Sequence, residues 1–136
     1  MRLYKLTDYM DRTHGGCQWG VGVTVETDGV GELCGPGYTH WYTSPLVAVF
    51  LNPIHGNFDL VTAHLWEGEG AVVKDDRGLK VGCTKATTLQ RVELPVLSTA
   101  VRVRVALECA KLVCTDTAWN AWADKWLSGK DRKSVV

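Results

Sequence analysis

The chain has 136 residues, of which 46% are apolar and 22% are charged, with fifteen basic and fifteen acidic side chains. This length and apolar content suit a single domain over residues 1–136 and exclude a disordered chain. The balanced charge lacks the basic excess of a nucleic-acid-binding protein, so we do not expect nucleic acid as a partner.

The longest uncharged apolar stretch, residues 41–54, is interrupted by Pro45, Asn52 and Pro53 and is shorter than the roughly 20 residues of a membrane span. The first residues lack the apolar core of a secretory signal. The five scattered cysteines suit reduced thiols better than a disulfide framework. We therefore expect a cytoplasmic protein without membrane segments or disulfides.

The first part of the chain indicates short strands separated by glycine-rich turns. Residues 3–6 predict a strand, and the alternating valines of residues 21–25 predict a second, half-buried one. Turn signals at residues 28–29 and 35–37 leave a short piece at residues 33–34.

A short helix is predicted over residues 46–51. Ser44 is a suitable N-cap, Pro45 suits the first helical position, and Pro53 ends the run. Further strands are predicted over residues 60–66, 71–74 and 87–94, with glycines at the turns between them.

After Pro95 the apolar period changes from that of strands to that of helices. Ser98 caps a predicted helix, and Thr115 or Asp116 caps a second helix that Gly129 ends. The apolar face expected on the first helix comprises Val101, Val105, Ala106, Cys109, Leu112 and Val113, and that on the second comprises Trp119, Trp122 and Trp126.

These elements predict an α+β fold. A small, bent antiparallel sheet from about residues 1–95 would be covered by a C-terminal helical hairpin of about residues 98–128, with Trp122 buried against the sheet. The basic residues Lys130, Arg132 and Lys133 are expected to form a solvated tail.

Several runs of the sequence resemble a family of uncharacterised bacteriophage and prophage proteins. The runs are LYKLTD (residues 3–8), GELCGPGYTHWYTSPL (31–46), LNPIHG (51–56), LWEGEG (65–70) and WADKWLSGKDR (122–132). The resemblance implies an accessory protein in the host cytoplasm that binds a host protein, with anti-defence activity as the leading interpretation.

Two Cys/His pairs raise the question of a metal site. His14 and Cys17 are separated by two residues, and Cys34 and His40 by five, and such pairs can bind tetrahedral zinc. The second spacing is wide, and free cysteines commonly serve as small buried apolar residues. We therefore expect no bound metal.

An alternative interpretation is an enzyme similar to ADP-ribosyltransferases. Arg2, the Tyr-Thr-Ser run that ends at Ser44, and the pair Glu67 and Glu69 resemble, in order, the three motifs of that family. The resemblance implies NAD as cofactor, with the last glutamate stabilising the positive charge that develops on the ribose. The spacing of only 23 residues between Ser44 and Glu67 departs from the pattern.

A second catalytic interpretation is a hydrolytic centre of Cys34, His40, His55 and His64. A thiol becomes a nucleophile near neutral pH when a base lies beside it. The sequence does not show whether these four residues meet.

We favour a binding protein without a cofactor over either enzyme. Trp19 and Trp41 lie beside glycines and are expected to be exposed anchors of an interface. The segment from Cys34 to Tyr42 is expected to be a rigid loop that presents His40 and its aromatic neighbours to a host protein. The predicted binding residues are therefore Trp19, Cys34, His40, Trp41 and Tyr42.

Overall fold

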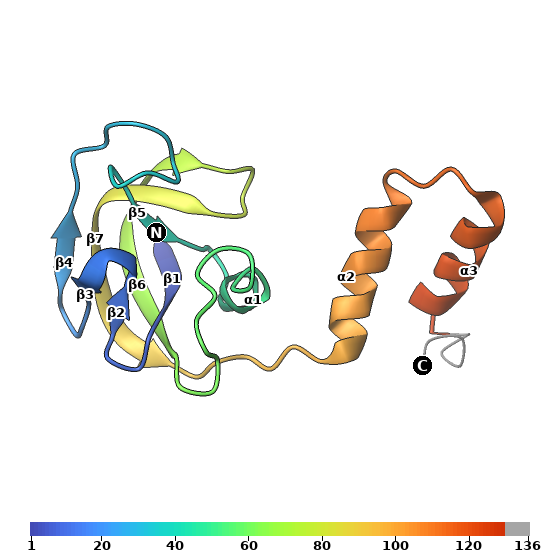
Figure 1. The fold of residues 1–136 in the computed structure, drawn as a ribbon, viewed down its shortest axis with the longest axis horizontal. Coiled ribbons are helices and arrows are strands. Elements are labelled where there is room, and N and C mark those ends of the chain that lie inside the picture. The colour runs from blue at the N-terminus through green and yellow to red at the C-terminus, as the bar shows by residue number, and fades with distance from the viewer. Residues whose placement is uncertain (130–136) are drawn as a thin grey trace. The chain divides into compact units, whose positions relative to one another are not determined.

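The computed structural model describes residues 1–129 (Figure 1), so the basic tail predicted at Lys130, Arg132 and Lys133 lies outside the described residues. The chain divides into two compact units, Met1–Pro95 and Val96–Val136. A mostly antiparallel sheet in the first unit and a pair of packed helices in the second confirm the predicted α+β class. One domain, and a sheet covered by the hairpin, stay predictions.

The first unit is built on a five-stranded sheet in the order β1-β6-β7-β4, with β5 also paired to β7. Every pairing in it is antiparallel. A separate two-stranded hairpin, β2 with β3, encloses a 3₁₀ turn at His14–Gly16. The strands are β1 Arg2–Thr7, β2 Arg12–Thr13, β3 Cys17–Gln18, β4 Thr24–Glu26, β5 Thr39–Trp41, β6 His64–Asp75 and β7 Val81–Val92.

The sheet bends until β5, which pairs with β7, comes beside β1. The long strands β6 and β7 curve visibly (Figure 1), and their pairing carries three register shifts, which are the bulges that bend antiparallel strands. The first half of β7 pairs with β5. Just after β5, Tyr42 exchanges two backbone hydrogen bonds of 2.8 Å with Tyr4 of β1. β1, β6, β7 and β5 therefore form a ring with an enclosed interior.

Some predicted strand boundaries were wrong because Gly68 and Gly70 lie within a strand and Gly22 lies outside one, contrary to expectation. Residues 64–66 and 71–74 of the pieces predicted at 60–66 and 71–74 lie in one strand, β6, which runs through Gly68 and Gly70, and residues 60–63 precede it. A Cβ atom on Gly68 would lie 2.7 Å from the ring of Trp41, so this glycine makes room for an indole. The strand predicted at 21–25 is shorter, Thr24–Glu26, because Gly22 adopts a positive φ of 74°.

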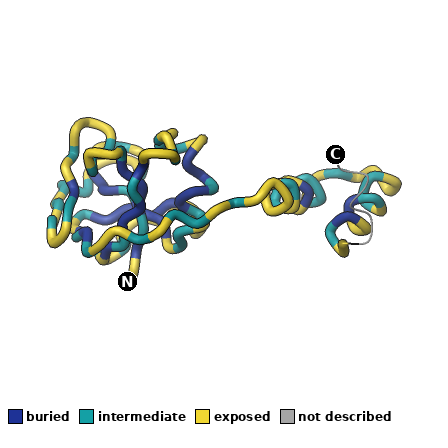
Figure 2. Tube along the Cα trace, turned by 90° about the horizontal axis from the view of Figure 1, so that it is seen from below, coloured by how far each residue is buried: buried dark blue, intermediate teal, exposed yellow. Residues whose placement is uncertain are grey.

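Two apolar clusters use opposite faces of β1. Leu3 lies in one cluster with Trp19, Trp41 and Cys83. Leu6 lies in the other, with residues of helix α1, Pro45–Phe50. In Figure 2 the buried stretches of this unit run through its middle, and the exposed stretches form its outer loops. Both faces of β1 are therefore buried, which is unusual for a strand that carries a lysine.

The three predicted helices and their N-caps are confirmed. Ser44 accepts the Leu46 N–H at the start of α1, as Ser98 accepts that of Val101 at the start of α2, Thr99–Lys111. Asp116 accepts the Trp119 N–H at the start of α3, Thr117–Leu127. No helix in residues 1–129 combines the length and apolar character that crossing a bilayer requires.

The second unit has its own apolar cluster. Leu107 of α2 packs with Ala123 and Trp126 of α3, and Val103 and Trp122 are partly buried against them. The apolar face predicted on α2, which includes Val101, does not make this contact with α3. Val103 and Leu107 make it, and they lie on the opposite side of the helix from the predicted face. Burial of Trp122 against the sheet stays a prediction.

Candidate functional site

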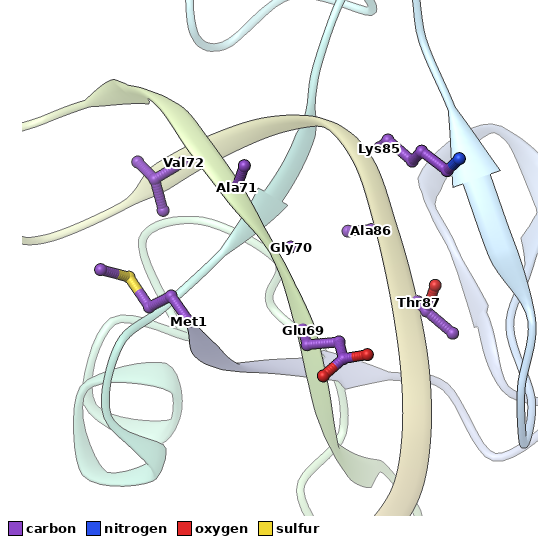
Figure 3. A pocket seen from close by; sticks show the side chains of 8 residues that line it. All are labelled: Met1, Glu69, Gly70, Ala71, Val72, Lys85, Ala86 and Thr87. Atoms are coloured by element: carbon purple, nitrogen blue, oxygen red, sulfur yellow. The ribbon is translucent and has the colours of Figure 1, made fainter.

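Two cavities of the first unit differ in their chemistry. Figure 3 shows the first, about 610 Å³, lined by Met1, Glu69, Gly70, Ala71, Val72, Lys85, Ala86 and Thr87. Its charged side chains are Glu69 and Lys85, and Lys85 lies 3.4 Å from Glu26 in an exposed ion pair. This cavity gathers few reactive groups.

The second cavity, about 650 Å³, collects most of the reactive side chains of the unit. We call it the Lys5 pocket. It is lined by β1, the β2–β3 hairpin, β5 and the loops around residues 33–36 and 54–58. Its polar and ionisable lining residues are Lys5, Thr13, His14, Cys17, Thr27, Cys34, Tyr38, Thr39, His40, Tyr42, His55 and Lys80. Two lysines and three histidines thus face a cavity to which no carboxylate of the described residues contributes.

Lys5 is the most unusual residue of the pocket. Its side chain is on the same face of β1 as Leu3 and Thr7, and only 5% of its surface is exposed. Its Nζ lies 4.1 Å from the ring centre of Trp19 and 4.4 Å from that of Trp41. Among the residues that the structure describes, none forms a hydrogen bond or an ion pair with this Nζ.

Burial governs the protonation of Lys5. Removal of the ammonium from water lowers the pKa of Lys5 to about 7, although the neighbouring thiols of Cys17 and Cys83 act in the opposite direction. The two indole faces also favour the charged form, by about 2 kcal/mol when such a contact is desolvated. Desolvation of a fully buried ammonium is larger, so the amine is largely neutral at slightly alkaline pH.

Tyr42 and His55 form a coupled pair on the wall of the pocket. The Tyr42 Oη and His55 Nδ1 are hydrogen bonded, and the two rings stack with centres 5.8 Å apart. Burial raises the pKa of Tyr42 to about 12 and lowers that of His55. Both groups are therefore neutral near pH 7, as a proton donor and acceptor pair must be.

His40 is also held neutral beside the pocket. Its Nε2 donates a hydrogen bond to the carbonyl of Leu33, which leaves Nδ1 as the acceptor of the neutral ring. Burial lowers the pKa of His40, the hydrogen bond to the Leu33 carbonyl opposes this, and the charges of Lys80 and Lys5 lower the pKa further. Lys80 itself is buried and places its Nζ 3.2 Å from the Cys34 Sγ.

The structure brings together most of the predicted binding residues but not in the predicted way. Cys34, His40, Tyr42 and Trp19 all line the Lys5 pocket. The prediction that Trp19 and Trp41 are exposed was wrong: their exposed fractions are 2% and 0%.

Trp41 is buried because the segment predicted as a loop, Cys34 to Tyr42, contains strand β5. In β5, Thr39 and Trp41 are buried on one face of the strand and His40 lies on the other face. The Trp41 ring therefore fills the space above Gly68.

The three residues Cys34, His40 and His55 of the predicted hydrolytic centre share the Lys5 pocket. His64 is not among its lining residues, because its Nδ1 lies 2.7 Å from a carboxylate oxygen of Asp11. Within residues 1–129 no group of three metal-binding side chains forms, so His14, Cys17, Cys34 and His40 do not meet as a zinc site there.

The residues of the transferase interpretation do not share a cavity. Arg2 forms an ion pair with Glu67 at 2.9 Å, and Ser44 caps α1. Glu69 lines the first cavity without Arg2 or Ser44, and none of the four lines the Lys5 pocket.

Lys5 and Lys80 were not predicted from the sequence as site residues. A lysine in a strand normally faces water, and the apolar neighbours Tyr4 and Leu6 gave no sign that the other face of β1 is buried as well. The residues that line the pocket come from segments far apart in the chain. A single sequence does not show that these segments meet.

Comparison with models of known families, with curated proteins and with solved structures finds no match to this chain. The resemblance to phage proteins and the binding of a host protein therefore stay predictions.

Proposed function

We propose that the Met1–Pro95 unit binds a small organic anion in the Lys5 pocket. The observation that supports this most strongly is that two lysines, Lys5 and Lys80, line the cavity while no carboxylate of the described residues lines it. A cavity of about 650 Å³ is within the range of ligand sites, roughly 300 to 1,000 Å³.

The rest of the lining suits a small molecule better than a macromolecule. Apolar and aromatic side chains such as Leu6, Ala48, Ile54 and Phe58 surround the polar groups. Ligand pockets commonly combine an apolar wall with a few polar groups that converge on one point. In such surroundings a charge-assisted hydrogen bond contributes about 1.5 to 3 kcal/mol.

The test is a titration of the ¹⁵N-labelled protein with glycolate and with inorganic phosphate, followed by NMR. We expect the amide signals of Lys5, His40 and Lys80 to shift together. A Lys80→Met variant should bind at least roughly tenfold more weakly, about 1.4 kcal/mol, because it loses one of the two ammonium groups.

Lys85→Met is the matched control, because Lys85 is exposed on β7 and lines only the first cavity. It should leave the affinity unchanged. Shifts confined to Glu69 and Lys85, or equal affinities of both variants and the unaltered protein, would contradict the proposal.

A further inference from the structure

We propose that Lys5 is a nucleophile that forms an imine with a small aldehyde acid or keto acid bound in the Lys5 pocket. This inference rests on the proposed function, because the anionic end of the ligand would be held by the basic lining. It goes further in assigning covalent chemistry to one residue and a carbonyl group to the ligand.

The position of the Lys5 amine carries the inference. The side chain is 95% removed from solvent, since its exposed fraction is 5%, yet it lines the cavity. A buried lysine is normally paired with a carboxylate, because an unpaired buried charge is costly. Here the described residues provide no acidic partner for Nζ, and its contacts are the faces of Trp19 and Trp41. This arrangement leaves the nitrogen free to react.

The surroundings favour the neutral amine, which is the reactive form. The ring faces and apolar neighbours withdraw Nζ from water, and the pKa of Lys5 falls to about 7 as a result. Lysine nucleophiles that form Schiff bases are activated in the same way, by desolvation in an apolar pocket.

The reaction balances without an oxidant or a reductant. The Lys5 nitrogen donates its lone pair to the carbonyl carbon, the C=O π pair moves to the oxygen, and a proton passes from nitrogen to oxygen to give a carbinolamine. The carbinolamine then loses its hydroxyl group and the remaining N–H hydrogen as water, and the C=N bond forms. One water molecule is released for each imine.

The same cavity contains groups that can move these protons. His40 keeps a free lone pair on Nδ1, and the Tyr42–His55 pair is neutral and hydrogen bonded. A proton donor is needed when the hydroxyl group leaves, and a base is needed when nitrogen loses its hydrogen. The carboxylate of the ligand would pair with Lys80, the other lysine of the lining.

The inference is tested with glyoxylate, which is both an aldehyde and an anion. The folded full-length protein is incubated with glyoxylate and sodium cyanoborohydride near pH 7.5, so that any imine is reduced to a stable carboxymethyl-lysine. Peptide mass spectrometry then locates the adduct. We expect Lys5 to be modified at least roughly tenfold faster than any other lysine, and excess glycolate, which has no carbonyl group, to slow the reaction at Lys5 alone.

Two variants complete the test. Lys5→Met and Lys5→Arg should both lose the fast adduct, and Lys85→Met should keep it. Modification spread evenly over the lysines of the unaltered protein, or an unmodified Lys5, would overturn the inference even if a Lys5 variant failed to fold. If glycolate binds at Lys80 while Lys5 stays unmodified, the proposed function stands and the imine does not; if glycolate does not bind either, both fail.

Discussion

Lys5 is the residue that most distinguishes the chemistry of the Lys5 pocket. On β1 the neighbours Tyr4 and Leu6 face one apolar cluster and Leu3 faces the other, and the nearly buried Lys5 lines the cavity. Burial of the Lys5 ammonium against two indoles has a cost in folding free energy. Such a cost is typical of sites where function, rather than stability, determines the residue.

The first prediction concerns the pH dependence of stability. The pKa of Lys5 is about 7 in the folded chain and near the ordinary 10.5 in the unfolded chain, so the unfolded state binds more protons between these pH values. The free energy of unfolding contributed by this group therefore rises with pH from about 7 to 10.5, by on the order of 5 kcal/mol. Below pH 7 both states are protonated and the folded state carries the full cost.

Urea denaturation of the unaltered protein and of Lys5→Met at pH 6, 8 and 10 measures this contribution. The variant should be more stable than the unaltered protein at pH 6, and the difference should shrink as the pH rises. Lys85→Met corrects for the loss of a surface charge. A difference that stays constant over the three pH values would show that Lys5 titrates alike in both states.

The second prediction concerns Trp41, which is fully buried above Gly68. Trp41→Ala should lower the free energy of unfolding by roughly 3 to 5 kcal/mol, because it leaves a large cavity in the core. Trp41→Phe should cost less, and His40→Ala should leave the fold intact because His40 lies on the other face of β5. A loss below about 1 kcal/mol for Trp41→Ala in chemical denaturation would mean that the indole is exposed.

At the scale of elements, helices were easier to predict than strands. A helix start depends on neighbouring residues: Ser44, Ser98 and Asp116 each cap a helix through an N–H two or three residues later, and all three were predicted. Strand boundaries depend on distant partners. Gly68 is within β6 because Trp41 needs the space, and no local pattern contains that information.

The third prediction concerns the helical hairpin of the second unit. Trp126 is buried between the two helices, and Trp122 is only partly buried. Trp126→Ala should therefore destabilise the hairpin by roughly 3 kcal/mol, and Trp122→Ala by less. Hydrogen exchange of the amides in α2 and α3 measures both. Equal acceleration by the two variants would contradict the assignment of Trp126 as the centre of this cluster.

At the scale of the whole molecule, the sequence predicted the fold class but only part of the site. Cys34, His40 and Tyr42 were predicted as site residues and do line one cavity. The prediction failed to include Lys5 and Lys80, because their meeting depends on the ring that β5 closes between β7 and β1. The predicted mode of binding also differs from the structure. An exposed aromatic surface was predicted, whereas the structure has a cavity and buried indoles.

Imine formation at Lys5 requires an amine that is accessible through the cavity and largely neutral at slightly alkaline pH. Competitive labelling with a trace of acetic anhydride between pH 5 and 11, read for each lysine by peptide mass spectrometry, measures this directly. We expect Lys5 to be labelled in the folded protein with a midpoint near its pKa of about 7, and the midpoint to move toward 10.5 in urea. A folded-state midpoint near 10.5, or a Lys5 that is labelled only after unfolding, would contradict this expectation.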